Sequence, residues 1–452
     1  MTTNHGNVRK GLLRKRSLTK QFLFSKTSSK HEDDKPAGLP DDFDELVKVF
    51  PNIRIGDAFV DQSLAELKSS PTFGVMVISV DKSKNIKKDK SGKEYKNNAR
   101  LDVAGAIGRI CKIENGMWGV VDGDFFGCFF PEKSTSACSK LAEKIKGKLA
   151  KQKDETVTIG IASYPALNYK KIQILENARK AFDHAQFFGP DSTVSFDAVS
   201  LNISGDNLYD KGDIKGAIKE FKMALLLDPS NVNVHNSLGV CHGVLGDYKK
   251  ALKEFKSAIS LSPEDIMALH NAGLTCTLTG NKNKALEYFL RADSIDKDVF
   301  EVAFQIGKLY LEIEQPDKGM EYLEKAIKLK PESGPAFSSM GDCFTSLGMI
   351  DKAVSSYKKA IKLNANDADS LSALGLLFDA QGENIDISTL FCQQSVEISP
   401  ENGLFRYRLG RLYQKANKIE AASEEFEAAK KMGYDSTQEI NKIGNLQNTG
   451  TS

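Results

Sequence analysis

The chain has 452 residues, of which 40% are apolar and 27% are charged, and its formal net charge is +2. This is the composition of a folded protein with enough length for two or three domains, and the near-neutral charge gives no reason to expect a nucleic-acid partner. No run of 18 apolar residues occurs in the sequence. We therefore expect no transmembrane helix.

Residues 1–40 form a basic tail with nine Lys and Arg against three Asp and Glu, a net charge of +6. The remaining residues therefore sum to about −4, because the whole chain carries +2. Segments with such an excess of one charge are usually disordered and solvated, which is the interpretation we favour. Weak contact of the tail with a membrane surface is a second interpretation, since scattered apolar residues lie between the basic ones.

The seven cysteines are spread along the chain, and no two of them form a CxxC pair. Such spacing predicts neither a disulfide framework nor a metal site. Reduced, buried thiols are typical of proteins that work in the cytoplasm, and we expect that location here.

Residues 41–197 alternate between helical and strand patterns. Strands rich in branched side chains are expected over 72–81, 155–165 and 192–196, and helices over 42–67, 101–113, 137–152 and 171–188. A polar insertion occupies 82–98, and 117–131 has the pattern of a β-hairpin with Asp122-Gly123 at its turn. Helices that alternate with strands around one sheet form an α/β sandwich.

Four strings of this segment occur in a characteristic order. The hairpin sequence Asp122-Gly123-Asp124-Phe125 is followed by an apolar strand that ends at Pro131, by the strand Thr158-Ile159-Gly160-Ile161-Ala162, and by a closing helix and turn. In this order they resemble the GGDEF domain of diguanylate cyclases, which join two GTP molecules into cyclic di-GMP. The resemblance implies a sandwich of the nucleotide-cyclase type, a bacterial source and a homodimer formed through this domain.

The resemblance also implies a catalytic site that this sequence does not keep. Cyclase chemistry needs metal ions held by carboxylates, and the family's metal-binding Asp on the first strand is Ser79 here. The other departures concern the guanine, metal and phosphate contacts. The degenerate positions are Ser79, Asp122, Asp124, Phe125, Gln186 and Ser192. We therefore expect no cyclase activity, no cofactor and no bound metal.

Three acidic residues are candidates for residual nucleotide contacts: Asp81, Asp102 and Asp124. They leave open a second interpretation, in which the domain binds GTP or cyclic di-GMP without converting it. An active diguanylate cyclase is a third, which the degenerate positions oppose. A different relative of the nucleotide cyclases is a fourth.

A repeat of 34 residues runs through about 198–436. Each copy places a Gly in its first half and, 16 or 17 residues later, an aromatic or other bulky residue, with small residues and a Pro at fixed offsets. The first-half glycines are Gly205, Gly239, Gly273, Gly307, Gly341, Gly375 and Gly410. Seven copies with a single one-residue insertion indicate seven pairs of antiparallel helices that must stack to bury their apolar faces.

This spacing resembles that of tetratricopeptide (TPR) repeats, which form a helical solenoid. The resemblance implies that the first helix of each copy lines a groove that binds a protein or peptide partner. Carried onto this chain, the lining includes Asn236, Val240, His270, Leu274, Phe304, Lys308, Leu311, Asp342, Leu376, Tyr407 and Arg411. An apolar middle and a basic last copy (Arg408, Arg411 and Lys415) favour a peptide with an apolar centre and an acidic end.

The sequence thus predicts a basic tail over 1–40, an α/β sandwich over 41–197, an all-α solenoid over 198–436, and a capping helix with a frayed end over 437–452. The fold class is α+β followed by α. We expect a non-catalytic scaffold or signalling adaptor in which the array binds a partner and the first domain serves docking, dimerisation or sensing.

Overall fold

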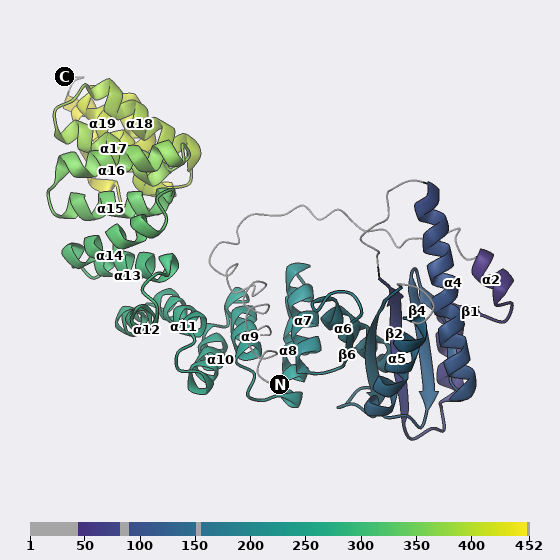
Figure 1. The fold of residues 1–452 in the computed structure, drawn as a ribbon. Coiled ribbons are helices and arrows are strands. Elements are labelled where there is room, and N and C mark those ends of the chain that lie inside the picture. Colours follow the sequence, from purple (N-terminus) through teal and green to yellow (C-terminus); the bar gives the residue numbers. More distant parts are fainter. Residues whose placement is uncertain (1–43, 82–89, 151–154, 450–452) are drawn as a thin grey trace. The chain divides into compact units, whose positions relative to one another are not determined.

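A computed structural model describes residues 44–81, 90–150 and 155–449 (Figure 1). The predicted basic tail and the start of the polar insertion therefore lie outside the described residues. Two compact units make up the chain, one that ends at Pro263 and one that begins at Glu264. Each unit is described by itself.

The first unit contains a six-stranded mixed sheet. Its strand order is β1-β3-β4-β2-β5-β6, with β2 antiparallel to both of its neighbours and with the pairs β1/β3 and β5/β6 parallel. The strands are β1 (Arg54–Ile55), β2 (Phe73–Val80), β3 (Met117–Asp122), β4 (Phe125–Pro131), β5 (Val157–Tyr164) and β6 (Thr193–Ser195). The central strand β2 is fully buried over its first six residues, as its apolar sequence predicts.

Helices cover both faces of this sheet, because alternate residues of its strands point to opposite sides. Met76 and Ile78 face one core with α4 (Lys90–Ile113) and α5 (Thr135–Leu149). Val75 and Val77 face the other core with α3 (Asp57–Glu66) and α6 (Ile174–Gln186). The three layers agree with the predicted sandwich. The hairpin β3/β4 forms as predicted, but its turn is Gly123-Asp124, one residue later than expected, because Asp122 still pairs with Phe125.

The expected single helix over 42–67 is wrong. The segment instead forms α2 (Asp44–Val49), the short strand β1 and then α3. Pro51 cannot continue a helix, and Gly56 adopts a positive φ of 69° just before α3. The break lets β1 pair with β3 at the edge of the sheet.

The same unit includes the first two helix pairs of the repeat, and α7 of the first pair packs on α6 of the sheet domain (Figure 1). These helices are α7 (Ala198–Asp210), α8 (Ile214–Leu227), α9 (Val232–Val244) and α10 (Tyr248–Leu261). Tyr169 and Phe196 of the sheet domain pack on the apolar core of α7 to α9. Lys180 of α6 forms an ion pair with Glu220 of α8, with 2.8 Å from Nζ to each carboxylate oxygen.

The second unit contains five further helix pairs and a final helix. They are α11 (Ile266–Leu278), α12 (Lys282–Ile295), α13 (Phe300–Glu312), α14 (Pro316–Leu329), α15 (Gly334–Ser346), α16 (Ile350–Leu363), α17 (Ala368–Ala380), α18 (Ile385–Ile398), α19 (Gly403–Lys415), α20 (Ile419–Lys431) and α21 (Thr437–Thr449). Each helix packs on the next along the chain. The helix α21 follows the last pair, where a capping helix is expected.

In six of the seven pairs, a glycine in the first helix lies against an aromatic or leucine side chain of the second; in α17/α18, Gly375 lies against Cys392. A Cβ at Gly341 would lie 2.6 Å from Cε1 of Tyr357, and one at Gly239 would lie 2.6 Å from Cε1 of Phe255. These separations are too short for carbon atoms, so the helices can cross this closely only at glycine. The repeat spacing read from the sequence thus corresponds to a physical contact within each pair.

Candidate functional site

The hairpin tip of the sheet domain is held by two arginines. Arg179 of α6 forms an ion pair of 2.5 Å with Asp122. Arg100 of α4 donates to the carbonyl oxygen of Gly123 at 2.7 Å and lies 3.8 Å from the Asp124 carboxylate. Both carboxylates of the tip are therefore engaged within the protein.

Of the other sequence-predicted positions of this domain, all but Gln186 contact groups of the protein. Asp81 accepts hydrogen bonds from Thr158 Oγ1 at 2.6 Å and from the backbone N–H of Asp191 at 2.8 Å. Phe125 packs edge-on against Phe182 at 5.1 Å. Ser79 lies on β2 opposite Phe125 of β4, and the Ser192 hydroxyl donates to the Gly189 carbonyl. Asp102 lies on α4 and interacts with another group of the protein. Gln186 is exposed at the end of α6.

The second unit holds a concave cavity of about 720 Å³ among its repeats. It is lined by α13, α15, α17 and α19, the first helices of four consecutive pairs, and by Tyr357 of α16. Five of the predicted groove residues line it: Phe304, Lys308, Leu311, Asp342 and Leu376. They come together because a spacing of 34 residues returns the same helix face to the same side of the stack.

The cavity is acidic at its centre and apolar towards its ends. Asp342 of α15 and Asp369 of α17 are exposed to it, and Asp367 lines it at the start of α17. Apolar lining comes from α13 at one end and from Leu404 and Phe405 of α19 at the other. Phe304 and Leu311, two residues of the expected apolar middle of the groove, thus lie at one end of this cavity.

The surroundings of Asp342 disfavour its charged form. Its carboxylate reaches solvent, yet the walls of the cavity surround it, and this burial together with the nearby Asp369 and Asp367 raises the pKa of the group. The Tyr357 hydroxyl opposes this by donating a hydrogen bond of 2.7 Å. Burial and the repulsion from Asp367 also raise the pKa of Asp369.

The basic residues near the cavity are only partly available to a ligand. Lys308 lies over the Phe304 ring, with 5.8 Å from Nζ to the ring centre, and Arg408 donates from Nη1 to Ser372 Oγ at 2.9 Å. Lys415 forms an ion pair of 2.6 Å with Asp379. Arg411 is exposed on α19. Of the three residues at the predicted basic end of the groove, only Lys415 is therefore paired with a carboxylate of the protein.

The remaining predicted groove residues do not line this cavity. Asn236 and Val240 are buried on α9 of the first unit. In the second unit, His270 is buried on α11 against the Phe289 ring, and Leu274 is half-buried. Tyr407 packs on Phe426 and Tyr434 and donates to Glu439. Tyr357 and Asp369, which do line the cavity, are absent from the predicted set.

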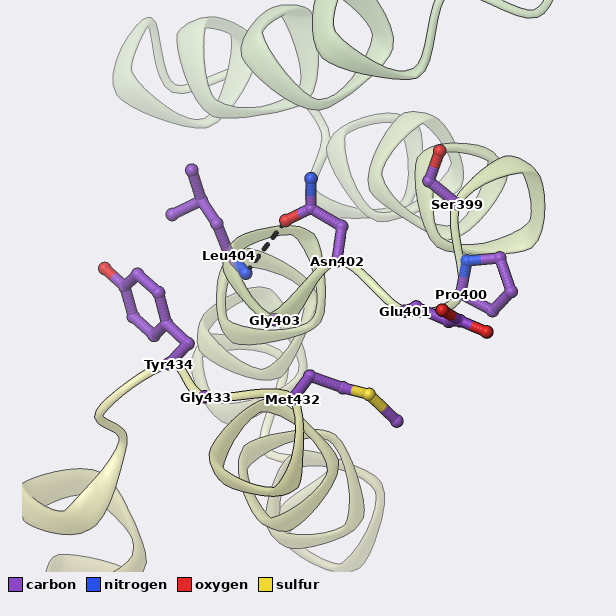
Figure 2. Close-up of a pocket in the computed structure, with 9 residues that line it drawn as sticks. All are labelled: Ser399, Pro400, Glu401, Asn402, Gly403, Leu404, Met432, Gly433 and Tyr434. Atoms are coloured by element: carbon purple, nitrogen blue, oxygen red, sulfur yellow. Dashed lines mark hydrogen bonds between the residues drawn. The ribbon is translucent and has the colours of Figure 1, made fainter. Parts of the chain in front are cut away.

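A second depression of about 710 Å³ lies between the α18–α19 turn and the end of α20. Figure 2 shows it bordered by Leu404, Met432 and Tyr434. Its most central polar group, the Asn402 side chain, caps α19 by accepting from the Leu404 N–H at 3.1 Å.

Comparisons with known families agree with the repeat geometry. A model described as TPR repeat matches residues 205–243 and 341–382. A model described as tetratricopeptide repeat matches residues 232–265, 268–299, 300–333 and 405–432. The helical array consists of tetratricopeptide repeats. The TPR matches cover copies in both units, and no curated protein matches the chain.

Solved TPR structures are also similar to the array. A tetratricopeptide repeat protein from Parabacteroides merdae is 20% identical over 55% of this chain and 98% of its own, with a TM-score of 0.45. MamA is 29% identical over 36% of this chain and 96% of its own, with a TM-score of 0.34. YrrB, described as a TPR protein with an unusual peptide-binding site, is 18% identical over 44% and 97%, with a TM-score of 0.37. At these TM-scores the similarities assign no function to this chain.

Among the described residues, no helix combines the length and apolarity that crossing a membrane requires. Within the same residues, no three His, Cys, Asp or Glu side chains lie together in a way that would hold a metal ion.

Proposed function

We propose that this protein is a non-catalytic scaffold or adaptor that binds a protein partner in the TPR cavity of the second unit. TPR repeats bind protein or peptide partners. The observation that carries the proposal is the cavity itself, lined from four consecutive first helices at the positions that the repeat spacing singles out. A concave surface built from equivalent positions suits an elongated segment that crosses several repeats.

In the same proposal the sheet domain serves the array as a docking module. The buried pair Lys180–Glu220 and the packing of Phe196 on the repeat core support a fixed attachment to the first two helix pairs. The alternative of a nucleotide-responsive sensor has less support, because Asp81, Asp122 and Asp124 already bind groups of the protein. Titration of the full chain with GTP and cyclic di-GMP would reveal that alternative through a heat of binding.

The proposal is tested by blocking the cavity with a single side chain. Ser346 lines the cavity at the end of α15, and Ser355 is an exposed serine on α16 of the same repeat that does not line it. Peptides selected from a random display library on the full chain should lose binding to Ser346→Trp and keep it with the matched control Ser355→Trp. Selected peptides that bind both variants equally, or a selection that yields no binders, would overturn the proposal.

A further inference from the structure

We infer that the partner segment of this cavity carries a Lys or Arg side chain, flanked by apolar residues, that binds between Asp342 and Asp369. This inference rests on the proposed function and specifies the chemistry of the partner. It follows from the charges, the hydrogen bonds and the apolar walls of the cavity.

Two carboxylates of the cavity face solvent from neighbouring first helices. Asp342 lies on α15 and Asp369 on α17, both line the cavity, and the charge of Asp369 acts on Asp342. Within the described residues, Asp369 forms no side-chain hydrogen bond or ion pair, and Asp342 accepts only from the Tyr357 hydroxyl. A carboxylate can accept several hydrogen bonds at once, so both groups retain acceptor sites for a cation from outside.

The basic side chains that line the cavity do not form ion pairs with these two aspartates. In the described residues, neither Lys308 nor Arg408 forms an ion pair with Asp342 or Asp369, although both lower the pKa of Asp369 through their charge. Arg408 is directed to Ser372, and Lys308 lies over Phe304. Three aspartates against two basic residues leave the lining with a net charge of −1.

Repulsion among the three aspartates makes the empty cavity electrostatically unfavourable. Burial and the neighbouring acids raise the pKa of Asp342, even though Arg408 acts in the opposite direction. An ammonium or guanidinium group placed between the two open carboxylates would relieve that repulsion and form charge-assisted hydrogen bonds. An acidic side chain at the same place would add to the repulsion.

Apolar side chains lie on both sides of the acidic centre. Phe304 and Leu311 of α13 line one end, and Leu404 and Phe405 of α19 line the other, with Leu376 of α17 between them. A segment that crosses α13 to α19 would therefore place apolar residues before and after its basic residue. Burial of the apolar residues of the partner would strengthen binding, and the aspartates would select a partner with a basic residue between them.

The test uses three pools of short synthetic peptides that differ only at the central residue. The flanking positions are randomised among Leu, Val and Phe between soluble tails, and the centre is Lys, Gln or Glu. Binding to the full chain is measured by fluorescence anisotropy. We expect the Lys pool to bind about tenfold or more tightly than the Gln pool, and the Glu pool to bind most weakly. The Lys preference should shrink as salt screens the charges.

Variants separate this inference from the proposed function. In Asp342→Asn/Asp369→Asn the Lys preference should disappear while the Gln pool still binds, and the amide oxygen introduced in place of the Asp342 carboxylate can still accept from Tyr357. The control Glu321→Gln/Glu324→Gln removes two exposed charges from α14, outside the cavity lining, and should leave the preference unchanged.

Two results would overturn the inference alone: a Lys preference that survives in the aspartate variant, or binding by the Gln or Glu pool that equals that of the Lys pool. In either case, loss of binding in Ser346→Trp would leave the proposed function standing. If no pool bound in a manner sensitive to Ser346→Trp, both the inference and the proposed function would fail.

Discussion

Replacing Glu220 with alanine should destabilise the first unit far more than removal of an exposed glutamate. The Lys180 and Glu220 side chains are only 9% and 13% exposed, and Nζ lies 2.8 Å from both carboxylate oxygens. Among the described residues, Lys180 pairs with no other carboxylate, and its remaining contact is the Tyr169 ring at 5.7 Å. Glu220→Ala would thus leave a buried, uncompensated ammonium group, which costs about 3–5 kcal/mol of folding stability.

Urea unfolding of the full chain provides the assay, with the fluorescence of Trp118 as the signal. This residue is the single tryptophan of the sequence and lies on β3, packed against Phe50. The signal therefore comes from the sheet, whereas the substitution is made on a repeat helix. A shift of the Trp118 transition would show that the sheet and the first two helix pairs unfold together.

A matched control and a rescue variant sharpen this test. Glu66 pairs with Arg54 at 3.8 Å, with both side chains about half exposed, so Glu66→Ala should change stability by less than about 1 kcal/mol. The double variant Lys180→Met/Glu220→Leu should recover most of the loss, because it buries no charge. The reasoning would be refuted if Glu220→Ala cost no more than Glu66→Ala, or if the double variant were as unstable as the single one.

Three further predictions concern the second unit. Gly341→Ala should cost about 1–3 kcal/mol, since its Cβ would lie 2.6 Å from the Tyr357 ring, as measured by urea unfolding followed by circular dichroism. Glu314 has a φ of 58° in a turn where other repeats have glycine, so Glu314→Gly should raise stability by about 1 kcal/mol in the same assay. Burial lowers the pKa of His270 to about 4, below the value of about 6.5 in an unfolded chain. Between these two pH values only the unfolded chain binds the proton. The free energy of unfolding should therefore keep its full value above about pH 6.5 and fall by up to about 3 kcal/mol as the pH approaches 4. His270→Leu should remove this loss.

Each of these three has its own contrary result. Gly444→Ala, whose Cβ would meet nothing within 4 Å, is the control for Gly341→Ala, and equal losses in the two would rule out the ring contact as the cause. An unchanged or lower stability of Glu314→Gly would show that the positive φ carries no strain. An acid dependence that is the same in wild type and His270→Leu would place the titrating group elsewhere.

The repeat array could be predicted from the sequence because its contacts are local and periodic. Gly341 and Tyr357 are 16 residues apart, and the same spacing recurs in neighbouring copies, so the pattern itself reports the contact. The first helices that line the cavity follow from the same period. Phe304, Leu311 and Leu376 were therefore found without the structure.

Features that depend on contacts between distant segments could not be predicted in this way. Lys180 and Glu220 belong to different predicted domains, and nothing in either local sequence marks the pair. The arginines that hold Asp122 and Asp124 come from α6 and α4, far along the chain from the hairpin. Tyr357 reaches the cavity from a second helix, although first helices alone were expected to line it.

The partners of the basic side chains on α19 could not be predicted for the same reason. The sequence predicts a basic end of the groove at Arg408, Arg411 and Lys415, and the side chains of Arg408 and Lys415 bind groups of the preceding first helix, α17. Their partners Ser372 and Asp379 lie 36 residues earlier, so these contacts depend on how the repeats stack, and only Asp379 carries an opposite charge. The basic character of one helix did not indicate which of its charges remain available.

The claim that the partner binds in the TPR cavity is tested most directly by photo-crosslinking in the cells that produce the protein. A photoreactive amino acid in place of Ser346 lies at the cavity, and one in place of Ser355 lies on the neighbouring helix outside it. We predict a discrete crosslinked adduct with the same protein from Ser346 and none from Ser355. Adducts that form equally from both positions, or from Ser355 alone, would contradict the account.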